Sequence, residues 1–487
     1  MEALKVNKVK TTPLGGKIWF SVLFFGLIGQ IAWVVENMYF ATLAQDIFFN
    51  SGRSDLSYII TTLMVIFSAV TATTTSIFAG GLCDRMGKRK PFISIGYILW
   101  GITIMLFGFI PMTATGGRII TVAVFLVVLD CVMTLVGSTA NDAAFNAWVA
   151  DVTDTTNRGK VNTLLSILPV IAVIIIFIGL GSLYDKTKET NWLFFLVLGL
   201  IPFVAGFMSM FLLKDKPNLP KIKNDSFIKD TFYGFKPSVI KENKMMYVCL
   251  AAACVVGISQ QTFFSYLMNF VIETLGFGDR FVVPVAVIIV GAAVITGICG
   301  VFYDKIGKKH FFIPLLVFLI LGTLTFFLLK FMDKGAGKTA VMYIAGLCMM
   351  GSVLSLSGAL NASFQDYIPK GCEGRFQGVR MCFTVLIPMI IGPIISLGIG
   401  LDAMGMNGEG FTPPYEIFLA AAIVAVLAFI PIYFVRRDAN NLRNRKLKEK
   451  EEQSAETTIP EETVVEEVVA SEIEVENAEP IVETTEE

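Results

Sequence analysis

Twelve apolar runs divide the sequence, and each is long enough to cross a bilayer as a helix. A membrane-spanning helix needs about 20 apolar residues. Inside lipid the backbone can satisfy its hydrogen bonds only within a helix or a closed barrel, so continuous runs of this length are predicted to be helical. We therefore expect an all-α polytopic membrane protein with twelve transmembrane helices. The runs lie near 18–44, 57–82, 92–112, 118–148, 162–184 and 191–213, and then near 245–272, 281–302, 311–332, 339–365, 378–400 and 414–435.

The composition excludes several classes of protein. Charged residues make up only 16% of the chain and hydrophobic residues 54%, whereas soluble domains are about 25% charged. The eight cysteines have no paired or metal-like spacing, and there is a single histidine, which argues against a histidine-based metal site or catalytic triad. We expect no enzyme activity, no metal centre, no nucleic-acid partner and no cofactor beyond a coupling ion, H⁺ or Na⁺.

A short basic motif occurs twice, which indicates two related halves. Gly, three residues, Asp, a base, one residue, Gly and two bases occupy positions 80–89 and return at 300–309. Asn141 and Asn361 form a second pair, again 220 positions apart. We predict two six-helix pseudo-repeats, an arrangement found in transporters. The predicted parts are an N-terminal segment 1–17, a bundle 18–213, a linker 214–244, a bundle 245–435, and a basic then acidic disordered tail 436–487.

The distribution of Lys and Arg predicts the orientation. Placing both termini in the cytoplasm assigns 31 Lys and Arg to the inner side and eight to the outer side, as the positive-inside rule requires. The first apolar run is too long for a cleaved signal peptide. Short loops favour the plasma membrane of a bacterium, where we expect a monomer surrounded by membrane lipid.

Two acidic residues are predicted to couple transport to a cation. Asp130 is about 18 Å along its helix at 1.5 Å per residue, near the middle of the bilayer. A charge there costs about 2.5–3.5 kcal/mol, so it must face a cavity or a partner. Glu36, on the first helix, lies closer to the outer third and is the second candidate. A structural role for Asp130 and a gating or interfacial role for Glu36 stay open.

Amide, hydroxyl and aromatic side chains are the candidates for binding a solute. Buried amides are costly in lipid and should face a cavity or another helix. An indole beside amides suits a sugar, which has one apolar face and several hydroxyl groups. The alternative for each is helix packing. The predicted binding residues are Gln30, Trp33, Asn37, Thr134, Asn141, Gln260, Gln261, Phe264 and Asn361.

The repeated basic motif is predicted to act in a cytoplasmic gate, because its position excludes it from the midplane. Glycines permit the tight turn, and the charges can pair with neighbouring helix ends or meet anionic lipid headgroups. A purely topological role for the charges is the alternative. The predicted gating residues are Gly80, Asp84, Arg85, Gly87, Lys88, Arg89, Asp151, Arg158, Gly300, Asp304, Gly307 and Lys308.

The motif at 80–90 resembles the loop 2–3 signature of the major facilitator superfamily, with a degenerate copy at 300–309. The resemblance covers about residues 17–435. Asp130, Asp151 and the Arg158-Gly159 turn are similar to helix 4 of the glycoside–pentoside–hexuronide cation symporters and the sucrose–proton symporters. On helix 2, Ser68, Thr71 and Thr75 stand where the symporters have paired carboxylates.

These observations favour a secondary active transporter. We expect a cation, with H⁺ as the first choice, to be coupled to symport of a sugar or glycoside by alternating access. No nucleotide-binding motif occurs, so the energy would come from an ion gradient. Two alternatives stay open: a proton-driven exporter of drugs or metabolites with the same fold, and a non-transporting sensor or scaffold.

Overall fold

All regular structure in the described part of the chain is helical. The computed structural model describes residues 14–153, 158–185, 187–215, 233–306, 308–368, 376–407 and 412–438. Within these ranges, eleven helices are long and apolar enough to cross a membrane. A shorter apolar helix, Ile167–Leu183, lies in the region of the fifth predicted run.

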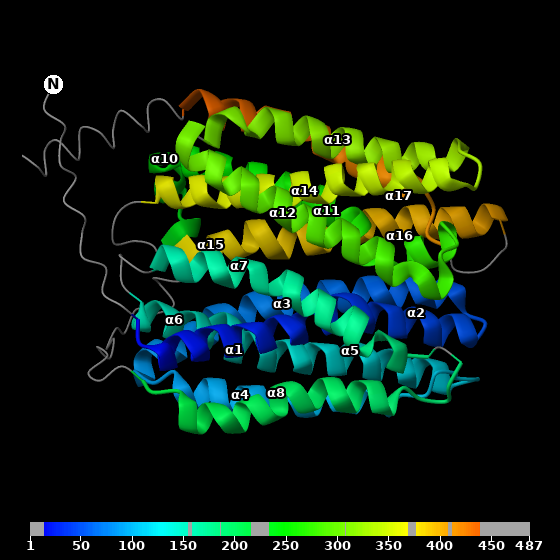
Figure 1. Ribbon diagram of the computed structural model, residues 1–487, viewed down its shortest axis with the longest axis horizontal. Helices are drawn as coiled ribbons and strands as arrows, with labels where there is room; N and C mark the ends of the chain where they lie inside the picture. The colour runs from blue at the N-terminus through cyan, green and yellow to red at the C-terminus, as the bar shows by residue number, and fades with distance from the viewer. Residues whose placement is uncertain are drawn as a thin grey trace, which may run out of the picture. The chain divides into compact units, whose positions relative to one another are not determined.

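The N-terminal helices lie side by side in the lower part of Figure 1. The first spanning segment is continuous from Gly16 to Asn50 and contains a π-helical turn at Val35–Phe40. The fourth contains a π-helical turn at Ser138–Phe145. The α-helices here are α1 (Gly16–Val34), α2 (Ala41–Asn50), α3 (Ser54–Met86), α4 (Lys90–Phe107), α5 (Arg118–Gly137), α6 (Asn146–Val152), α7 (Arg158–Ile174) and α8 (Trp192–Leu212).

The C-terminal helices occupy the upper part of Figure 1. They begin with a short helix before the seventh apolar run, and the eleventh spanning segment is again interrupted by a π-helical turn, at Cys382–Leu386. The α-helices here are α10 (Pro237–Glu242), α11 (Lys244–Asn269), α12 (Val282–Ile306), α13 (Phe312–Leu328), α14 (Ala336–Tyr367), α15 (Gln377–Met381), α16 (Ile387–Asn407) and α17 (Glu416–Leu427).

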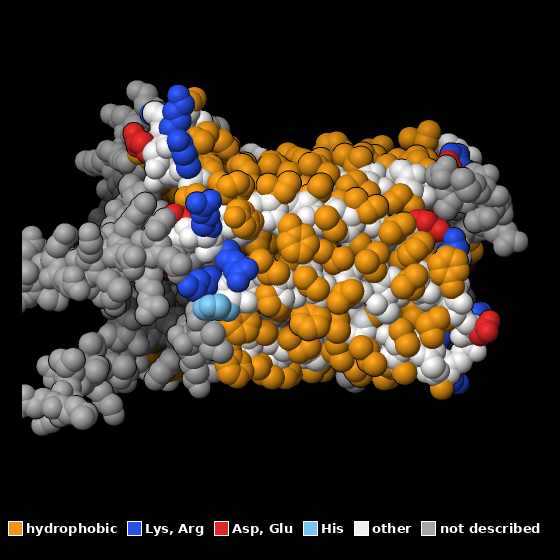
Figure 2. All heavy atoms as spheres, turned by 90° about the horizontal axis from the view of Figure 1, so that it is seen from above, with side chains coloured by type: hydrophobic (Ala, Val, Ile, Leu, Met, Phe, Trp, Pro, Cys, Tyr) orange, Lys and Arg blue, Asp and Glu red, His pale blue; other side chains and the backbone are white. Residues whose placement is uncertain are grey.

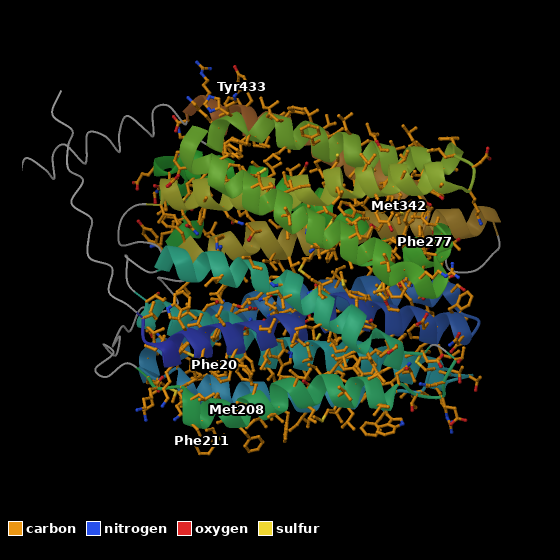
Figure 3. The ribbon with its side chains drawn as sticks, viewed as in Figure 1. Phe20, Met208, Phe211, Phe277, Met342 and Tyr433 are labelled. Atoms are coloured by element: carbon orange, nitrogen blue, oxygen red, sulfur yellow. The ribbon has the colours of Figure 1, made fainter. Side chains whose placement is uncertain are left out.

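The outer surface of the bundle is apolar, as contact with lipid requires. Phe211 is 83% exposed and points away from the helices (Figure 3). Figure 2 shows hydrophobic side chains covering the middle of one face, with Lys and Arg gathered toward the ends. A soluble protein rarely exposes an apolar surface of this extent, so the exposed face is suited to the hydrocarbon core of a membrane.

Two compact units divide the chain, residues 1–434 and residues 435–487. All the helices named above belong to the first unit. Of the predicted tail, residues 436–438 continue a helix, and residues 439–487 lie outside the described residues. Of the predicted linker, residues 214–215 and 233–244 are described, and the N-terminal segment is described from residue 14 onward.

Small residues allow α4 and α8 to pack closely. Gly101 on α4 faces Gly199 on α8, and a Cβ atom at Gly199 would lie 2.5 Å from the carbonyl oxygen of Gly101. Helices in membranes associate through such close backbone contacts, since lipid offers no hydrophobic gain on pairing them. The pair therefore joins two helices of the N-terminal half, and α8 in turn contacts α1.

Replacing Gly199 by Val should destabilise the protein, because the added atoms meet the backbone of α4. We expect a loss of about 1–3 kcal/mol, the usual cost of overpacking, seen as a lower melting temperature in detergent. The control is Gly297→Val on α12, where a Cβ atom has nothing within 4 Å. Equal melting temperatures for the two variants would contradict this account of the α4–α8 contact.

Candidate functional site

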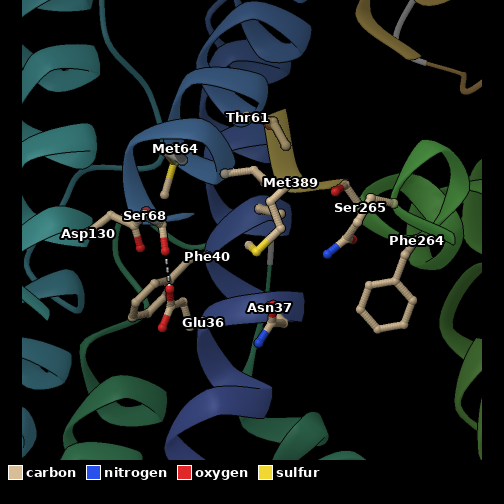
Figure 4. A pocket seen from close by; sticks show the side chains of 13 residues that line it. Glu36, Asn37, Phe40, Thr61, Met64, Ser68, Asp130, Phe264, Ser265 and Met389 are labelled. Carbon is tan, nitrogen blue, oxygen red and sulfur yellow. Dashed lines mark hydrogen bonds between the residues drawn. The ribbon is translucent and has the colours of Figure 1, made fainter. Parts of the chain in front are cut away.

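A cavity lies between the two groups of helices, near the middle of the bundle. Its enclosed volume is about 30 Å³, within a wider recess of about 440 Å³ that includes open solvent. Figure 4 shows Glu36, Ser68 and Asp130 on one side and Ser265 and Phe264 on the other. Because both halves contribute side chains, a solute bound here would contact both. The lining residues are Glu36, Asn37, Phe40, Ala41, Thr61, Met64, Val65, Ser68, Asp130, Gln261, Phe264, Ser265 and Met389.

The π-helical turn of the first spanning segment presents Glu36 to this cavity. One carboxyl oxygen, Oε1, accepts hydrogen bonds from Ser68 Oγ at 2.5 Å and Thr134 Oγ1 at 3.0 Å. The second oxygen, Oε2, is buried and has no hydrogen-bond partner among the described residues. A π-helical turn inserts a residue into the helix and often marks a functional site. Here it places one carboxyl group between α3 and α5.

Asp130 borders the same cavity from α5. Its side chain is only 2% exposed, and its Oδ1 atom has no hydrogen-bond partner among the described residues. The carboxyl groups of Asp130 and Glu36 are close enough to repel each other when both are charged. None of the thirteen lining residues is Lys, Arg or His. The site therefore holds two acidic groups without a balancing base.

The C-terminal half contributes an amide, an aromatic ring and a hydroxyl group from α11. Gln261, Phe264 and Ser265 lie on one turn of this helix and line the cavity, and Met389 of α16 lies beside them. Gly392 permits α16 to approach α11 here, since a Cβ atom at Gly392 would lie 2.6 Å from Gln261 Cβ. The close contact fixes Gln261 relative to α16.

A second cavity lies within the N-terminal half and is lined by Gln30, Trp33, Asn141, Asp142 and Asn146, together with Gly26, Phe145, Leu165 and Leu168. Asn141 accepts a hydrogen bond from Tyr97 at 3.1 Å. Trp33 packs edge to face on Trp100, with ring centroids 5.0 Å apart. The structure thus separates Gln30, Trp33 and Asn141 from the cavity that contains Glu36 and Asp130.

The basic motif forms the turn between α3 and α4. We call the end of the bundle that carries this turn the basic end. Gly87 has a φ of 61°, a left-handed conformation that ends α3. Arg89, only 7% exposed, pairs with Asp151 at 3.1 Å. Asp215 accepts hydrogen bonds from the backbone N–H groups of Arg89 and Lys90, each at 2.9 Å. These contacts join the turn to the end of α6 and to the segment that follows α8.

The far end of the bundle, opposite the basic end, holds polar contacts between the halves. Thr62 of α3 and Tyr266 of α11 share a hydrogen bond of 3.2 Å. The rings of Tyr58 and Tyr266 lie 5.4 Å apart. Gly400 of α16 fits against Tyr58, where any side chain at Gly400 would collide with the ring. The cavity is therefore closed toward this end.

Residues 18–393 match a family model described as the Major Facilitator Superfamily. The chain belongs to the Major Facilitator Superfamily. This match confirms the resemblance seen in the loop motif at the superfamily level, and it makes the protein a member of a family of membrane transporters rather than of enzymes. No curated protein matches the chain in sequence.

Solved structures of other major facilitator proteins share the fold. A D-xylose-proton symporter is 13% identical, with a TM-score of 0.65 over 86% of this chain and 97% of the symporter. A mutant of the nucleoside transporter NupG is 12% identical, with a TM-score of 0.64 over 86% and 99%. A bacterial homolog of the human lysosomal transporter Spinster, inward-facing and unoccupied, is 14% identical, with a TM-score of 0.63 over 88% and 98%.

The structure distributes the predicted binding residues of this major facilitator protein over three places. Asn37, Gln261 and Phe264 line the central cavity, where Thr134 supports Glu36. Gln30, Trp33 and Asn141 line the second cavity, and Gln260 and Asn361 line neither. Ser68 and Asp142 were not predicted as binding residues. Helical spacing gave no signal for Ser68, whereas a second polar residue directly after Asn141 was a signal for Asp142.

The structure describes only some of the predicted gating residues. Gly80 and Gly300 have open space where a side chain would stand, and Arg85 and Lys88 are exposed. Gly307 lies outside the described residues, and nothing is described for the side chains of four others: Asp84, Arg158, Asp304 and Lys308. The observed partners of the turn are therefore Asp151, which was predicted, and Asp215, which was not.

Replacing Asp130 by Asn should stabilise this major facilitator protein at pH 8 in the absence of solute. A buried charge beside a second carboxyl group is destabilising, and the amide removes this charge without changing the size of the side chain, so we expect a gain of about 1–3 kcal/mol. The measurement is the melting temperature in detergent. As a control, Asp55→Asn removes an exposed ion pair with Arg53 and should change stability by only about 0–1 kcal/mol. A lower melting temperature for Asp130→Asn would contradict the prediction.

Removing the carboxylate of Asp215 should loosen the start of α4. Two backbone N–H groups would lose their acceptor, and the loss of such a cap costs about 0.5–2 kcal/mol. In Asp215→Ala, the backbone amide hydrogens of Arg89 and Lys90 should exchange faster than in the wild type, as measured by hydrogen–deuterium exchange. The exposed Asp333→Ala is the control. Unchanged exchange at residues 89–90 would show that the cap contributes little.

Proposed function

We propose that this protein is a secondary active transporter that couples a cation, with H⁺ as the expected ion, to symport of a sugar- or glycoside-type solute by alternating access. The observation that supports this most is the pair of buried carboxyl groups, Glu36 and Asp130, beside a cavity that both halves line. Acidic groups at membrane depth are costly and are typical of proton and ion pathways.

The proposed topology has twelve transmembrane helices with both termini in the cytoplasm of a bacterial cell. The basic end then faces the cytoplasm, in agreement with the positive-inside rule. In this topology the far end, where Thr62, Tyr266 and Gly400 pack, would face outward, and the conformation would be closed to the outside. The Arg89–Asp151 pair and Asp215 would stabilise the cytoplasmic turn while the halves rock.

Protonation is the proposed switch between loaded and empty states. Two charged carboxyl groups repel each other in a low-dielectric site, which opposes closure around them. A proton on either group removes part of this repulsion. Ser68 and Thr134 donate to one oxygen of Glu36, which holds that carboxyl group in position whether or not Oε2 binds a proton. Neither Na⁺ nor H⁺ requires a resident cofactor.

Uptake into proteoliposomes tests this proposal. When the outside is more acidic than the lumen, so that protons flow inward, the wild-type protein should accumulate its solute. In Asp130→Asn and Glu36→Gln this gradient-driven accumulation should fall by tenfold or more, about 1.4 kcal/mol of coupling. Exchange of labelled for unlabelled solute at equal pH should continue, because it needs no net proton movement. Asp185→Asn, in an exposed loop, is the control.

Two results would contradict the coupling assignment. One is accumulation by Asp130→Asn that equals the wild type under the same pH gradient. The other is accumulation driven by a sodium gradient alone, which would replace H⁺ by Na⁺ while leaving the symport mechanism intact.

A proton-driven exporter of amphipathic organic cations is a second candidate. Four large apolar side chains, Phe40, Met64, Phe264 and Met389, line the cavity beside the two acids, and flexible methionines adapt to varied apolar ligands. In inside-out vesicles with an acidic lumen, an exporter would accumulate a lipophilic cation such as ethidium in the lumen in exchange for protons. A symporter of sugars would leave ethidium fluorescence unchanged.

A further inference from the structure

We propose that the solute is recognised through a protonated amino group, so that the site takes an amine-bearing polyhydroxylated solute of the amino-sugar class in preference to the neutral sugar. The inference rests on the proposed transport function and specifies the substrate of the same cavity. Three observations support it: the charge of the cavity, its unused hydrogen-bond acceptors and the chemistry of its other walls.

The ionisable groups of the cavity are both acidic and have no basic counterpart in its walls. Glu36 and Asp130 are the only ionisable groups among the thirteen residues that line it. If one of the two lining carboxyl groups holds the coupling proton, the other remains a carboxylate in a medium that stabilises charge poorly. A cationic group on the solute would neutralise this second carboxylate.

The unused hydrogen-bond capacity of the two carboxyl groups is acceptor capacity, and the hydroxyl group of Thr61, also buried and unpartnered among the described residues, can donate or accept. Glu36 Oε2 and Asp130 Oδ1 are buried and unpartnered among the described residues. The nearby hydroxyl groups of Ser68 and Thr134 both contact Glu36 Oε1 instead. An ammonium group brings three donors and no acceptor, and charge-assisted hydrogen bonds to carboxylates are stronger than neutral ones. A sugar hydroxyl group supplies a single donor and leaves the charge unbalanced.

The remaining walls suit a polyhydroxylated body. The side-chain NH₂ of Asn37 donates to the carbonyl oxygen of Trp33 at 2.7 Å, which leaves its Oδ1 to accept from a hydroxyl group. Gln261 can both donate and accept. Phe40 and Phe264 offer apolar surfaces for the C–H face of a ring. An amine at one end and hydroxyl groups at the other would use every polar wall.

Matched ligands test the inference directly. Binding of D-glucosamine, D-glucose and N-acetyl-D-glucosamine to the purified full-length protein is measured by calorimetry at pH 7. D-glucosamine should bind at least about tenfold more tightly than D-glucose, about 1.4 kcal/mol. N-acetyl-D-glucosamine should lose that advantage, because acetylation keeps the nitrogen but removes its charge. D-galactosamine and D-galactose repeat the comparison with the other configuration at C4.

Variants locate the preference within the cavity. Asp130→Asn should reduce the ratio of the dissociation constants for D-glucose and D-glucosamine to about one or two, since the charged partner is gone. Gln261→Ala is the matched control: it should weaken both ligands equally and leave the ratio unchanged, because an amide does not distinguish an amine from a hydroxyl group by charge.

Equal affinity for both members of each ligand pair would overturn the inference, as would an amine preference that persists in both Asp130→Asn and Glu36→Gln. A third contrary result would be that NaCl alone stabilises the protein and that the amine preference disappears in Na⁺. The second carboxylate would then bind a metal ion, and the inference would be overturned as well. Gradient-driven uptake of D-glucose without an amine preference would overturn only this inference. An amine preference without gradient-driven uptake would overturn only the coupling.

Discussion

The organisation of this protein depends on two carboxyl groups placed where a charge is most costly. A helix can satisfy its backbone inside lipid, but it cannot satisfy an acidic side chain. Glu36 meets this constraint in part, because a π-helical turn directs it toward two hydroxyl groups, on α3 and α5. Asp130 does not, since its Oδ1 atom has no partner among the described residues. The unsatisfied charge marks this part of the bundle as functional, because packing alone would favour its replacement by an apolar residue.

Rigid helix pairs on either side make such a cavity possible. Gly101 and Gly199 bring α4 and α8 into backbone contact, and Gly392 does the same for α16 and α11 beside Gln261. Close contacts of this kind resist deformation. The contacts between the halves at the far end, such as the hydrogen bond between Thr62 and Tyr266, are made by side chains. The expected motion therefore separates the halves and preserves each half.

The sequence predicted the helical class, the membrane environment and the superfamily, because long apolar runs and a repeated turn motif are local signals. It also placed Glu36, Asp130, Asn37, Gln261 and Phe264 among the candidates that the structure brings to one cavity. The partner Ser68 could not be predicted, because its contact with Glu36 depends on how two helices are rotated. The separation of Asn141 from Asp130 follows from the π-helical turn at Ser138–Phe145, which shifts the helical register after Gly137. Asp215 lies 126 positions from Arg89, beyond any local pattern.

The same geometry connects stability, coupling and recognition. An empty cavity with two repelling carboxyl groups is the least favourable state of this site, and anything that supplies a positive charge improves it. In the proposed mechanism a proton would do so on one carboxyl group and a solute ammonium on the other, so each would make the binding of its companion more favourable. Because binding free energies are reciprocal, the bound solute must then raise the affinity of the site for the proton. Coupling of this kind needs no direct contact between the two ligands, only a shared negative site whose closure is easier when both charges are balanced.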